Sequence, residues 1–450
     1  MQKGQILRIK INHLAPDGNG YAVVEGRTVP VKGALPGDEV DVCVRSLRRF
    51  SARVSLESIV SSEIQRIQPK CPHFSRCGGC IWQDVPYDVQ CRLKKLLVGV
   101  ALSGLCGVEL PNDIGFRPSP DIFFYRNKME FSFDEPPQTG SLVLGLHESS
   151  RYDRVFDVTT CHLQSELSNR AVLLTRDFAC RHGLKAYGIK SHEGLLRFLV
   201  VRDGKSTGEA MINLVTSGEE FKQIHDFCNC LVKEIPEITT VLRTINRRLG
   251  SVASGGEREI LFGDGFIRER VGDYLFTISP DAFFQTNTHQ TKQLYDTIRE
   301  FSRLTGKERL LDLYCGTGTI GIYLAEKAAE VTGVELVPDA VRDSERNAHL
   351  NGVGNISFIA GQAERIVNES MDNFDVILCD PPRAGIHPKV MSWLVRMRIP
   401  RMIYVSCNVR AIPGDLETLV MAGYRVKDVR VFDMAPHTRH IETVLLLEIE

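Results

Sequence analysis

The sequence lacks an excess of charge of either sign. Its 450 residues include 55 Lys and Arg and 56 Asp and Glu, which leaves a formal net charge of −1 at pH 7. This balance excludes a histone-like polycation and a protein with a dominant acidic tail, because both need a large surplus of one sign. It does not exclude nucleic-acid binding, for which a local basic face is sufficient.

Long hydrophobic runs are lacking as well. The longest, such as Thr443–Leu447, are far shorter than the roughly 20 residues that span a bilayer. The N-terminus has no apolar stretch of the kind found in signal peptides, so we expect a cytoplasmic protein without membrane contact. Its 13 cysteines, an odd number, cannot all form disulfides. In a reducing compartment, a tight cysteine cluster indicates metal binding or catalysis.

The length predicts about three domains of roughly 150 residues each. Residues 1–58 read as five short strands separated by glycine-rich turns, which is typical of a small barrel of the OB type that binds single-stranded nucleic acid. Four arginines gather near one turn of this segment, and they are either a solvated charge run or an RNA contact. The arginines are Arg45, Arg48, Arg49 and Arg53.

A β-rich central domain is expected over residues 69–282, with helices at 89–105, 163–182 and 219–235. It opens with Cys71, Cys77 and Cys80, and the pair Gly78-Gly79 lets the chain wrap tightly. A fourth thiolate would complete a tetrad for zinc or for an iron–sulfur cluster, and the spacing leaves both open. The spacing differs from that of radical S-adenosylmethionine enzymes.

Strands and helices alternate over residues 283–450, which predicts an α/β domain with a doubly wound sheet and parallel βαβ units. Ligands of such folds bind outside the carboxyl ends of the strands. The turn Gly316-Thr-Gly318-Thr-Ile-Gly321 follows a strand, and Glu335 ends the next strand. This pattern fits a dinucleotide or S-adenosylmethionine, whose ribose hydroxyls an acidic side chain can bind. Asp312 before the glycines, and a later Asp-Pro-Pro turn, favour S-adenosylmethionine.

That turn, Asp380-Pro381-Pro382, is typical of enzymes that methylate a planar base or amide. Arg383 follows it where amine methyltransferases place an aromatic residue, which favours another acceptor atom. Cys407 comes directly after the next strand and is a candidate nucleophile. Thiolate addition to C6 of uracil would make C5 nucleophilic, although a buried structural cysteine is the alternative.

A base must then remove the C5 proton, and the end of the chain supplies candidates. Glu442 lies at the start of the last predicted strand, where a carboxylate can reach the same site. His437 and His440 are rival bases on chemical grounds.

Together these motifs resemble the RNA (uracil-5-)-methyltransferase family, in its ribosomal branch with a TRAM domain and an iron–sulfur cluster. Residues 18–23 and 36–40 resemble the TRAM domain, an RNA-binding OB-like module. Phe283-Phe284-Gln285-Thr286-Asn287 matches the family motif that opens its Rossmann-like methyltransferase domain at residue 283. The resemblance covers almost the whole chain. It implies a monomeric enzyme that transfers a methyl group from S-adenosylmethionine to C5 of a uridine in 23S ribosomal RNA.

By this resemblance Cys407 is the nucleophile and Glu442 the general base. The resemblance further assigns S-adenosylmethionine contacts to Gln285, Tyr314, Thr319, Glu335, Gln362 and Asp380. It also implies a [4Fe-4S] cluster held by Cys71, Cys77, Cys80 and Cys161. Three positions depart from the family pattern, namely His162, Gln362 and Val409. Two alternatives stay open, a transfer RNA methyltransferase and an RNA-binding assembly factor with a vestigial cofactor site.

Overall fold

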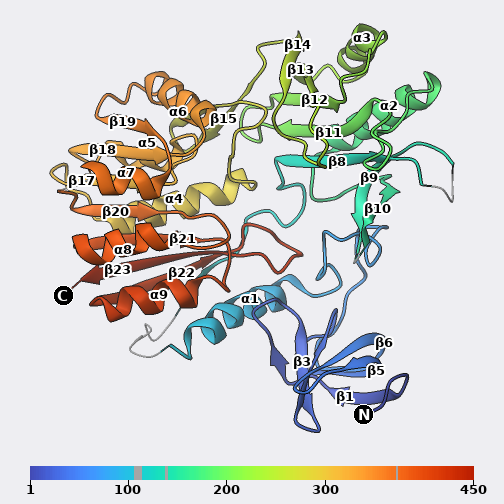
Figure 1. The fold of residues 1–450 in the computed structure, drawn as a ribbon, viewed down its shortest axis with the longest axis horizontal. Helices are drawn as coiled ribbons and strands as arrows, with labels where there is room; N and C mark the ends of the chain where they lie inside the picture. The colour runs from blue at the N-terminus through green and yellow to red at the C-terminus, as the bar shows by residue number, and fades with distance from the viewer. Residues whose placement is uncertain (106–113, 137–139, 150, 371–372, 450) are drawn as a thin grey trace. The chain divides into compact units, whose positions relative to one another are not determined.

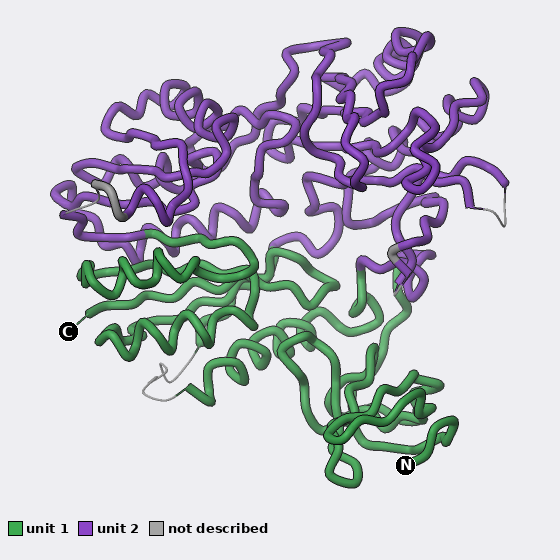
Figure 2. Tube along the Cα trace, in the orientation of Figure 1, with its two compact units in different colours: residues 1–70, 80–119, 378–450 green, residues 71–79, 120–377 purple. Residues whose placement is uncertain are grey.

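The computed structural model describes residues 1–105, 114–136, 140–149, 151–370 and 373–449. By its contacts the chain divides into two compact units, coloured separately in Figure 2. The first unit holds residues 1–70, 80–119 and 378–450, and the second holds 71–79 and 120–377. Within the described residues, no helix is long and apolar enough to cross a membrane.

The first unit begins with two antiparallel three-stranded sheets, ordered β1-β5-β6 and β2-β3-β4. Side chains of successive strand residues point to opposite faces, so one face of each sheet can be apolar. Val29, Val31, Val40 and Val42 are fully buried on these inner faces. The barrel predicted for this segment is confirmed, with one strand more than expected. The strands are β1 (Ile6–Lys10), β2 (His13–Leu14), β3 (Gly20–Val24), β4 (Arg27–Val31), β5 (Asp38–Leu47) and β6 (Ala52–Ser62).

The remainder of the first unit combines helices with strands in the order β21-β23-β22-β7. β23 pairs antiparallel with β21 and β22, so parallel βαβ units do not extend to these strands. β7 pairs in parallel with β22, and this pairing joins Gly115 to Arg430. The elements are α1 (Tyr87–Leu102), β7 (Gly115–Arg117), α8 (Pro388–Met397), β21 (Arg401–Ser406), α9 (Ile412–Met421), β22 (Tyr424–Phe432) and β23 (Glu442–Ile449).

The second unit contains a seven-stranded sheet in the order β10-β9-β8-β11-β12-β13-β14, visible in Figure 1. All of its pairings are antiparallel except β12 with β13. This agrees with the β-rich region predicted from the sequence. The elements are β8 (Lys128–Asp134), β9 (Val143–Glu148), β10 (Arg151–Asp157), α2 (Glu166–Arg181), β11 (Leu196–Asp203), β12 (Ala210–Thr216), α3 (Ile224–Glu234), β13 (Ile238–Ile245) and β14 (Glu257–Phe262).

Three parallel strands in the order β19-β18-β17 form the other part of the second unit. Their bounds are Arg309–Leu313, Glu330–Glu335 and Ile356–Ala360, within the region where the sequence predicts parallel strands. The division between the units falls inside β20 (Val376–Cys379). The accompanying elements are β15 (Ile267–Val271), β16 (Tyr274–Ile278), α4 (Thr288–Ser302), α5 (Thr319–Ala325), α6 (Pro338–Leu350) and α7 (Ala363–Ser370).

Two helices of the second unit begin later than the sequence pattern suggests. α2 starts at Glu166 because Ser165 caps it, its hydroxyl accepting a hydrogen bond from the Ser168 amide at 3.0 Å. α3 starts at Ile224 instead of Glu219, since the groups of Glu219 are used elsewhere. Its carboxylate accepts from the Gly194 amide, and its carbonyl accepts from the Arg243 guanidinium.

Candidate active site

Strand register brings the predicted nucleophile and base to one end of the sheet in the first unit. Ser406 at the end of β21 pairs with Thr443 on antiparallel β23. Cys407 follows Ser406, and Glu442 precedes Thr443, so both residues lie at this end of the strand pair. Opposed residues of neighbouring strands are close enough for their side chains to interact.

Glu442 is buried at this site, and Asp380 is partly buried. Glu442 is 5% exposed. Burial raises its pKa well above the ordinary range, the charge of Asp380 adds to this rise, and Arg383 opposes it. Burial also raises the pKa of Asp380 to about 7. Two partly desolvated carboxylates near each other cannot both ionise easily, so the site favours holding a proton at neutral pH.

The same charged groups shift the pKa of the Cys407 thiol. Burial, and then the charges of Glu442 and Asp380, raise the pKa of its thiol to about 11. Arg383 acts in the opposite direction through its charge and a side-chain hydrogen bond to the thiol. The site therefore holds a protonated thiol, a carboxylate pair able to accept its proton, and a cation able to stabilise the thiolate.

Arg383 is the member of this cluster that the sequence analysis did not assign to the site. Its backbone carbonyl accepts a 2.7 Å hydrogen bond from the Asn408 side chain, which ties the turn after β20 to the loop after β21. In the sequence, the position of Arg383 directly after Asp380-Pro381-Pro382 was the indication that it belongs to the site. Its hydrogen bond to the Cys407 thiol appears only in the folded structure.

Replacing Arg383 by Met is expected to raise the pKa of Cys407 further, because the cation that favours the thiolate is lost. Alkylation of Cys407 by iodoacetamide, followed by peptide mass spectrometry between pH 7 and 10, measures this effect. Below the pKa, the rate should fall about tenfold for each unit by which the pKa rises. Arg410→Met is the matched control, since Arg410 is exposed and is not among the groups that shift this thiol. Equal alkylation profiles for Arg383→Met and wild type would contradict the assignment.

The two rival bases are placed differently. His437 is buried, with its backbone amide donating to the Gln90 side chain and its carbonyl accepting from the amides of Ile81 and Trp82. His440 is exposed. Glu442 shifts the pKa of Cys407 through its charge and lies at the same strand end as that thiol. The geometry therefore favours Glu442 as the base.

The glycine turn after β17 lies in the second unit. Tyr314, Gly316 and Gly318 have φ angles of 65°, 56° and 74°, the left-handed conformation that glycine adopts most easily. A Cβ at Gly316 would meet no atom within 4 Å, so the space beside this turn is open. The Glu335 carboxylate accepts hydrogen bonds from the amides of Gly316 and Val337, at 3.0 and 2.8 Å. An open turn beside an oriented carboxylate fits a ribose-bearing cofactor.

Other predicted cofactor residues gather around this turn. The Thr317 hydroxyl donates to the Phe283 carbonyl at 3.4 Å, which joins the segment of Gln285 to the turn. The hydroxyls of Thr319 and Tyr295 are 2.8 Å apart. The Gly361 amide donates to the Glu335 carbonyl at 2.8 Å and brings the adjoining Gln362 to the same strand ends. Asp380 belongs to the first unit, with Cys407 and Glu442.

Three of the four predicted cluster cysteines lie in the second unit and interact. Burial raises the pKa of Cys77 most, and the charges of Cys161 and Cys71 raise it further. The Gly79 amide donates to the Cys77 sulfur at 3.3 Å. Cys161 accepts from the amides of Leu163 and Gln164, which lower its pKa against the effect of burial. Amide donors aimed at sulfur suit thiolate ligands.

These cysteines do not form a closed metal cage. In the part of the chain that the structure describes, no group of three or more His, Cys, Asp or Glu side chains is arranged to hold a metal ion. Cys80 lies in the first unit, where its sulfur accepts from the Gln83 side chain at 3.7 Å. The donor chemistry therefore fits thiolate ligation, but the structure does not show the predicted tetrad.

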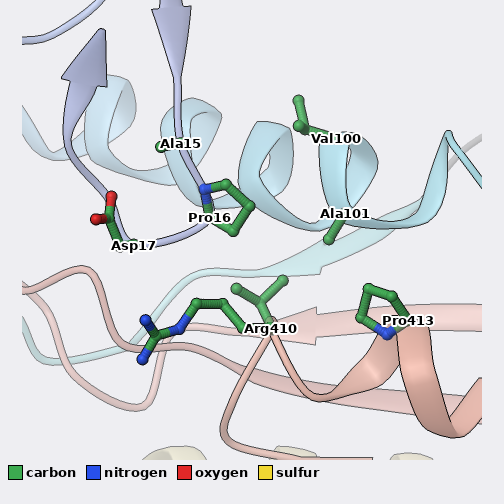
Figure 3. Close-up of a pocket in the computed structure, with 8 residues that line it drawn as sticks. Ala15, Pro16, Asp17, Val100, Ala101, Arg410 and Pro413 are labelled. Atoms are coloured by element: carbon green, nitrogen blue, oxygen red, sulfur yellow. The ribbon is translucent and has the colours of Figure 1, made fainter. Parts of the chain in front are cut away.

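A cavity of about 430 Å³ lies in the first unit beside the loop that follows Cys407 (Figure 3). Val409, Arg410 and Pro413 form one wall, and Val100 and Ala101 of α1 form another. The turn of residues 15–17 from the barrel completes the lining.

Comparison with known families and proteins agrees with this geometry. Residues 221–450 match the family described as tRNA (Uracil-5-)-methyltransferase, and residues 1–56 match the TRAM domain. An uncharacterized RNA methyltransferase of Chlorobaculum tepidum is 35% identical, with 99% of this chain and 97% of that protein covered. A second, from Caldanaerobacter subterraneus, is 36% identical with both chains fully covered.

Among solved structures, the tRNA (uracil-54, C5)-methyltransferase of Pyrococcus abyssi in complex with S-adenosyl-L-homocysteine is similar with a TM-score of 0.78. It is 29% identical, and the match covers 98% of this chain and 100% of that one. The likeness therefore extends over the barrel, the sheet-rich region and the glycine-turn region.

Proposed function

The chain belongs to the tRNA (uracil-5-)-methyltransferase family, and we propose that it methylates C5 of a uridine in large-subunit ribosomal RNA through a covalent adduct with Cys407. The observation that carries the proposal is the register of β21 and β23, which sets Cys407 and Glu442 at one strand end with Arg383 bonded to the thiol. This is the arrangement that a nucleophile, a base and a thiolate-stabilising cation require.

In the proposed reaction the Cys407 proton moves to the carboxylate pair of Asp380 and Glu442, and Arg383 stabilises the thiolate. The sulfur adds to C6 of uracil, an S–C6 bond forms, and the C5–C6 π electrons move to the C4 oxygen as an enolate. Glu442 later takes the proton from methylated C5. The electrons of the broken C5–H bond restore the C5–C6 double bond, the S–C6 bond breaks, and Cys407 leaves as thiolate. Before Glu442 takes the C5 proton, the carboxylate pair passes the Cys407 proton to solvent, which leaves Glu442 ionised. Afterwards the C5 proton on Glu442 returns to the Cys407 thiolate. The site is thereby restored, and one proton is released for each methyl group transferred.

Bound S-adenosylmethionine supplies the methyl group that C5 acquires. The residues fit this cofactor, because Glu335 is oriented by two amides beside an open glycine turn. We assign the ribose to Glu335, the adenine side to Gln362 and the methionine end to Asp380. Gln285 makes a further contact with the cofactor. Tyr314 and Thr319 line the turn. A buried target base must leave its stack to reach Cys407, so the uridine is flipped out of the RNA.

Two classes of RNA are candidate substrates, ribosomal RNA and transfer RNA, and a methyl-transfer assay distinguishes them. The resemblance to the ribosomal branch with its cysteine cluster supports ribosomal RNA, whereas the description of the matching family and the similarity to the Pyrococcus abyssi enzyme support transfer RNA. The TRAM match does not separate the two, because that similarity extends over the barrel. Purified protein with labelled S-adenosylmethionine should transfer methyl groups to unmodified 23S ribosomal RNA, and not to unmodified transfer RNA. The opposite preference would support the second candidate. No transfer to either RNA, with cofactor binding intact, would favour the non-catalytic factor.

We further propose that Cys71, Cys77, Cys80 and Cys161 hold a [4Fe-4S] cluster with a structural role. Protein purified without oxygen should be brown and contain about four irons per chain. Cys77→Ser should lose the iron and the visible absorbance, whereas Cys180→Ser, which changes an exposed cysteine, should keep both. Stoichiometric zinc without iron would contradict the cluster.

A further inference from the structure

Helix α1 holds the loop between β22 and β23 through two buried side chains. This loop, residues 433–441, starts after Phe432 and ends before Glu442, and those two residues pair across the strands. Glu442 is the first residue of β23, so the direction of its backbone depends on the conformation of the loop that precedes it. A feature that fixes the loop therefore also fixes the carboxylate of Glu442.

The first contact is an ion pair with no exposed surface. Lys94 donates from Nζ to Oδ1 of Asp433 at 2.6 Å and to the Ala435 carbonyl at 2.9 Å, and both charged side chains are 0% exposed. Oδ2 of Asp433 accepts from the Tyr87 hydroxyl at 3.0 Å. Buried ion pairs contribute little net stability compared with apolar residues of similar volume, and their best-supported role is to select one conformation.

The second contact is the amide of Gln90, which is fully buried. Its oxygen accepts from the His437 backbone amide at 2.8 Å, and its nitrogen donates to the carbonyls of Trp82 and Val85 at 2.9 and 2.8 Å. The same nitrogen lies 3.2 Å from Nδ1 of His437. Gln90 thus joins the loop to the segment that precedes α1.

The loop has a conformation that needs such support. His437 has a φ of 65°, in the left-handed region that side chains with a Cβ rarely adopt. Its carbonyl accepts from the amides of Ile81 and Trp82, at 3.0 and 3.1 Å, so both its backbone groups are held by residues 81–90. Strained residues of this kind persist where surrounding contacts over-determine them, often beside functional sites.

We infer that Gln90 and Lys94 of α1 are positioning residues for Glu442, which keep the general base in register with Cys407 by holding the loop of residues 433–441. The inference rests on the proposed function of Glu442. Neither α1 side chain has a role in the chemistry itself. Their loss slows removal of the C5 proton, while thiolate addition and methyl transfer proceed.

The test is Gln90→Leu in the full-length protein, assayed with the RNA transcript, ribosomal or transfer, that the transfer assay above shows to be methylated. The variant should lower kcat by tenfold to about 100-fold with KM changed less than about twofold, the scale of a misplaced catalytic group. The covalent RNA–protein adduct, seen on denaturing gels, should accumulate. Lys94→Met/Asp433→Leu replaces both charges by apolar side chains, and it should give the same pattern if Gln90→Leu does not fold.

Leu93→Ala is the matched control, because Leu93 is a buried α1 residue of the cluster around Trp82 and Val85 and is not bonded to the loop. It should lower the melting temperature without accumulating adduct. Adduct accumulation in Leu93→Ala, or wild-type kcat in folded Gln90→Leu and in the double variant, would overturn the positioning role. Absence of adduct in Glu442→Gln would instead overturn the proposed base, so the two failures are distinguishable.

Discussion

Replacing Cys407 by Ala is expected to abolish methyl transfer while S-adenosylmethionine still binds. Without the thiol no covalent bond to C6 forms, and C5 of uracil is too weak a nucleophile to take the methyl group. We expect the rate to fall by roughly 10⁴-fold or more, the scale of losing a covalent nucleophile. Labelled-methyl transfer measures the loss, and calorimetric titration measures cofactor affinity.

Cofactor affinity should remain within about twofold, because the glycine turn and Glu335 are unchanged, and Cys407 is a nucleophile that acts after binding. Cys180→Ala provides the control, since Cys180 is exposed on α2 and has no part in the site. It should retain wild-type activity. Residual turnover near wild type in Cys407→Ala would show that another group attacks C6 or that no adduct forms.

Replacing Glu442 by Gln is expected to stop the cycle one step later. The amide keeps the size of the carboxylate but cannot take the C5 proton, so methylated RNA stays bonded to Cys407. Loss of a general base lowers turnover by about 10²- to 10⁴-fold. A band of RNA–protein adduct should appear on denaturing gels, and Cys407→Ala in the same chain should remove it. If no adduct forms, another residue acts as the base.

The same substitution should change how stability depends on pH. The pKa of Glu442 in the folded protein is raised well above its ordinary value. Between these two values the folded state binds more protons than the unfolded state, so the free energy of unfolding falls as pH rises through this window. Glu442→Gln removes this dependence. The variant should therefore gain melting temperature relative to wild type as pH increases from 5 to 8.

Local patterns in the sequence were sufficient for the main elements of the fold and for proposing the site residues. The parallel strands of residues 309–313, 330–335 and 356–360 carry their own signal, because a short apolar run between turn residues is a local property. The glycine turn, the Asp-Pro-Pro turn and the cysteine after Ser406 are local as well. Family membership follows from such motifs, since each needs certain residue types at fixed spacing.

Those local patterns do not predict which distant strands pair. Antiparallel pairing of β21 with β23 places Cys407 and Glu442 at one strand end, although α9 and β22 separate the two strands in the sequence. The pairing of β7 with β22 joins residues 115–117 to residues 430–432, which are far apart in the sequence. Such register is decided by which faces become buried together, a property of the assembled sheet.

Electrostatic behaviour was likewise decided by the tertiary structure. Sequence alone identifies Cys407 as a thiol and Glu442 as a carboxylate, with ordinary pKa values. Burial beside Asp380 and Arg383 turns them into a high-pKa thiol and a proton-holding base. By itself the sequence indicated the family, the class of chemistry and the residues proposed for it. Only the fold set the proton affinities of these residues and bonded α1 to the loop that precedes Glu442, because desolvation and long-range hydrogen bonds exist only in the folded chain.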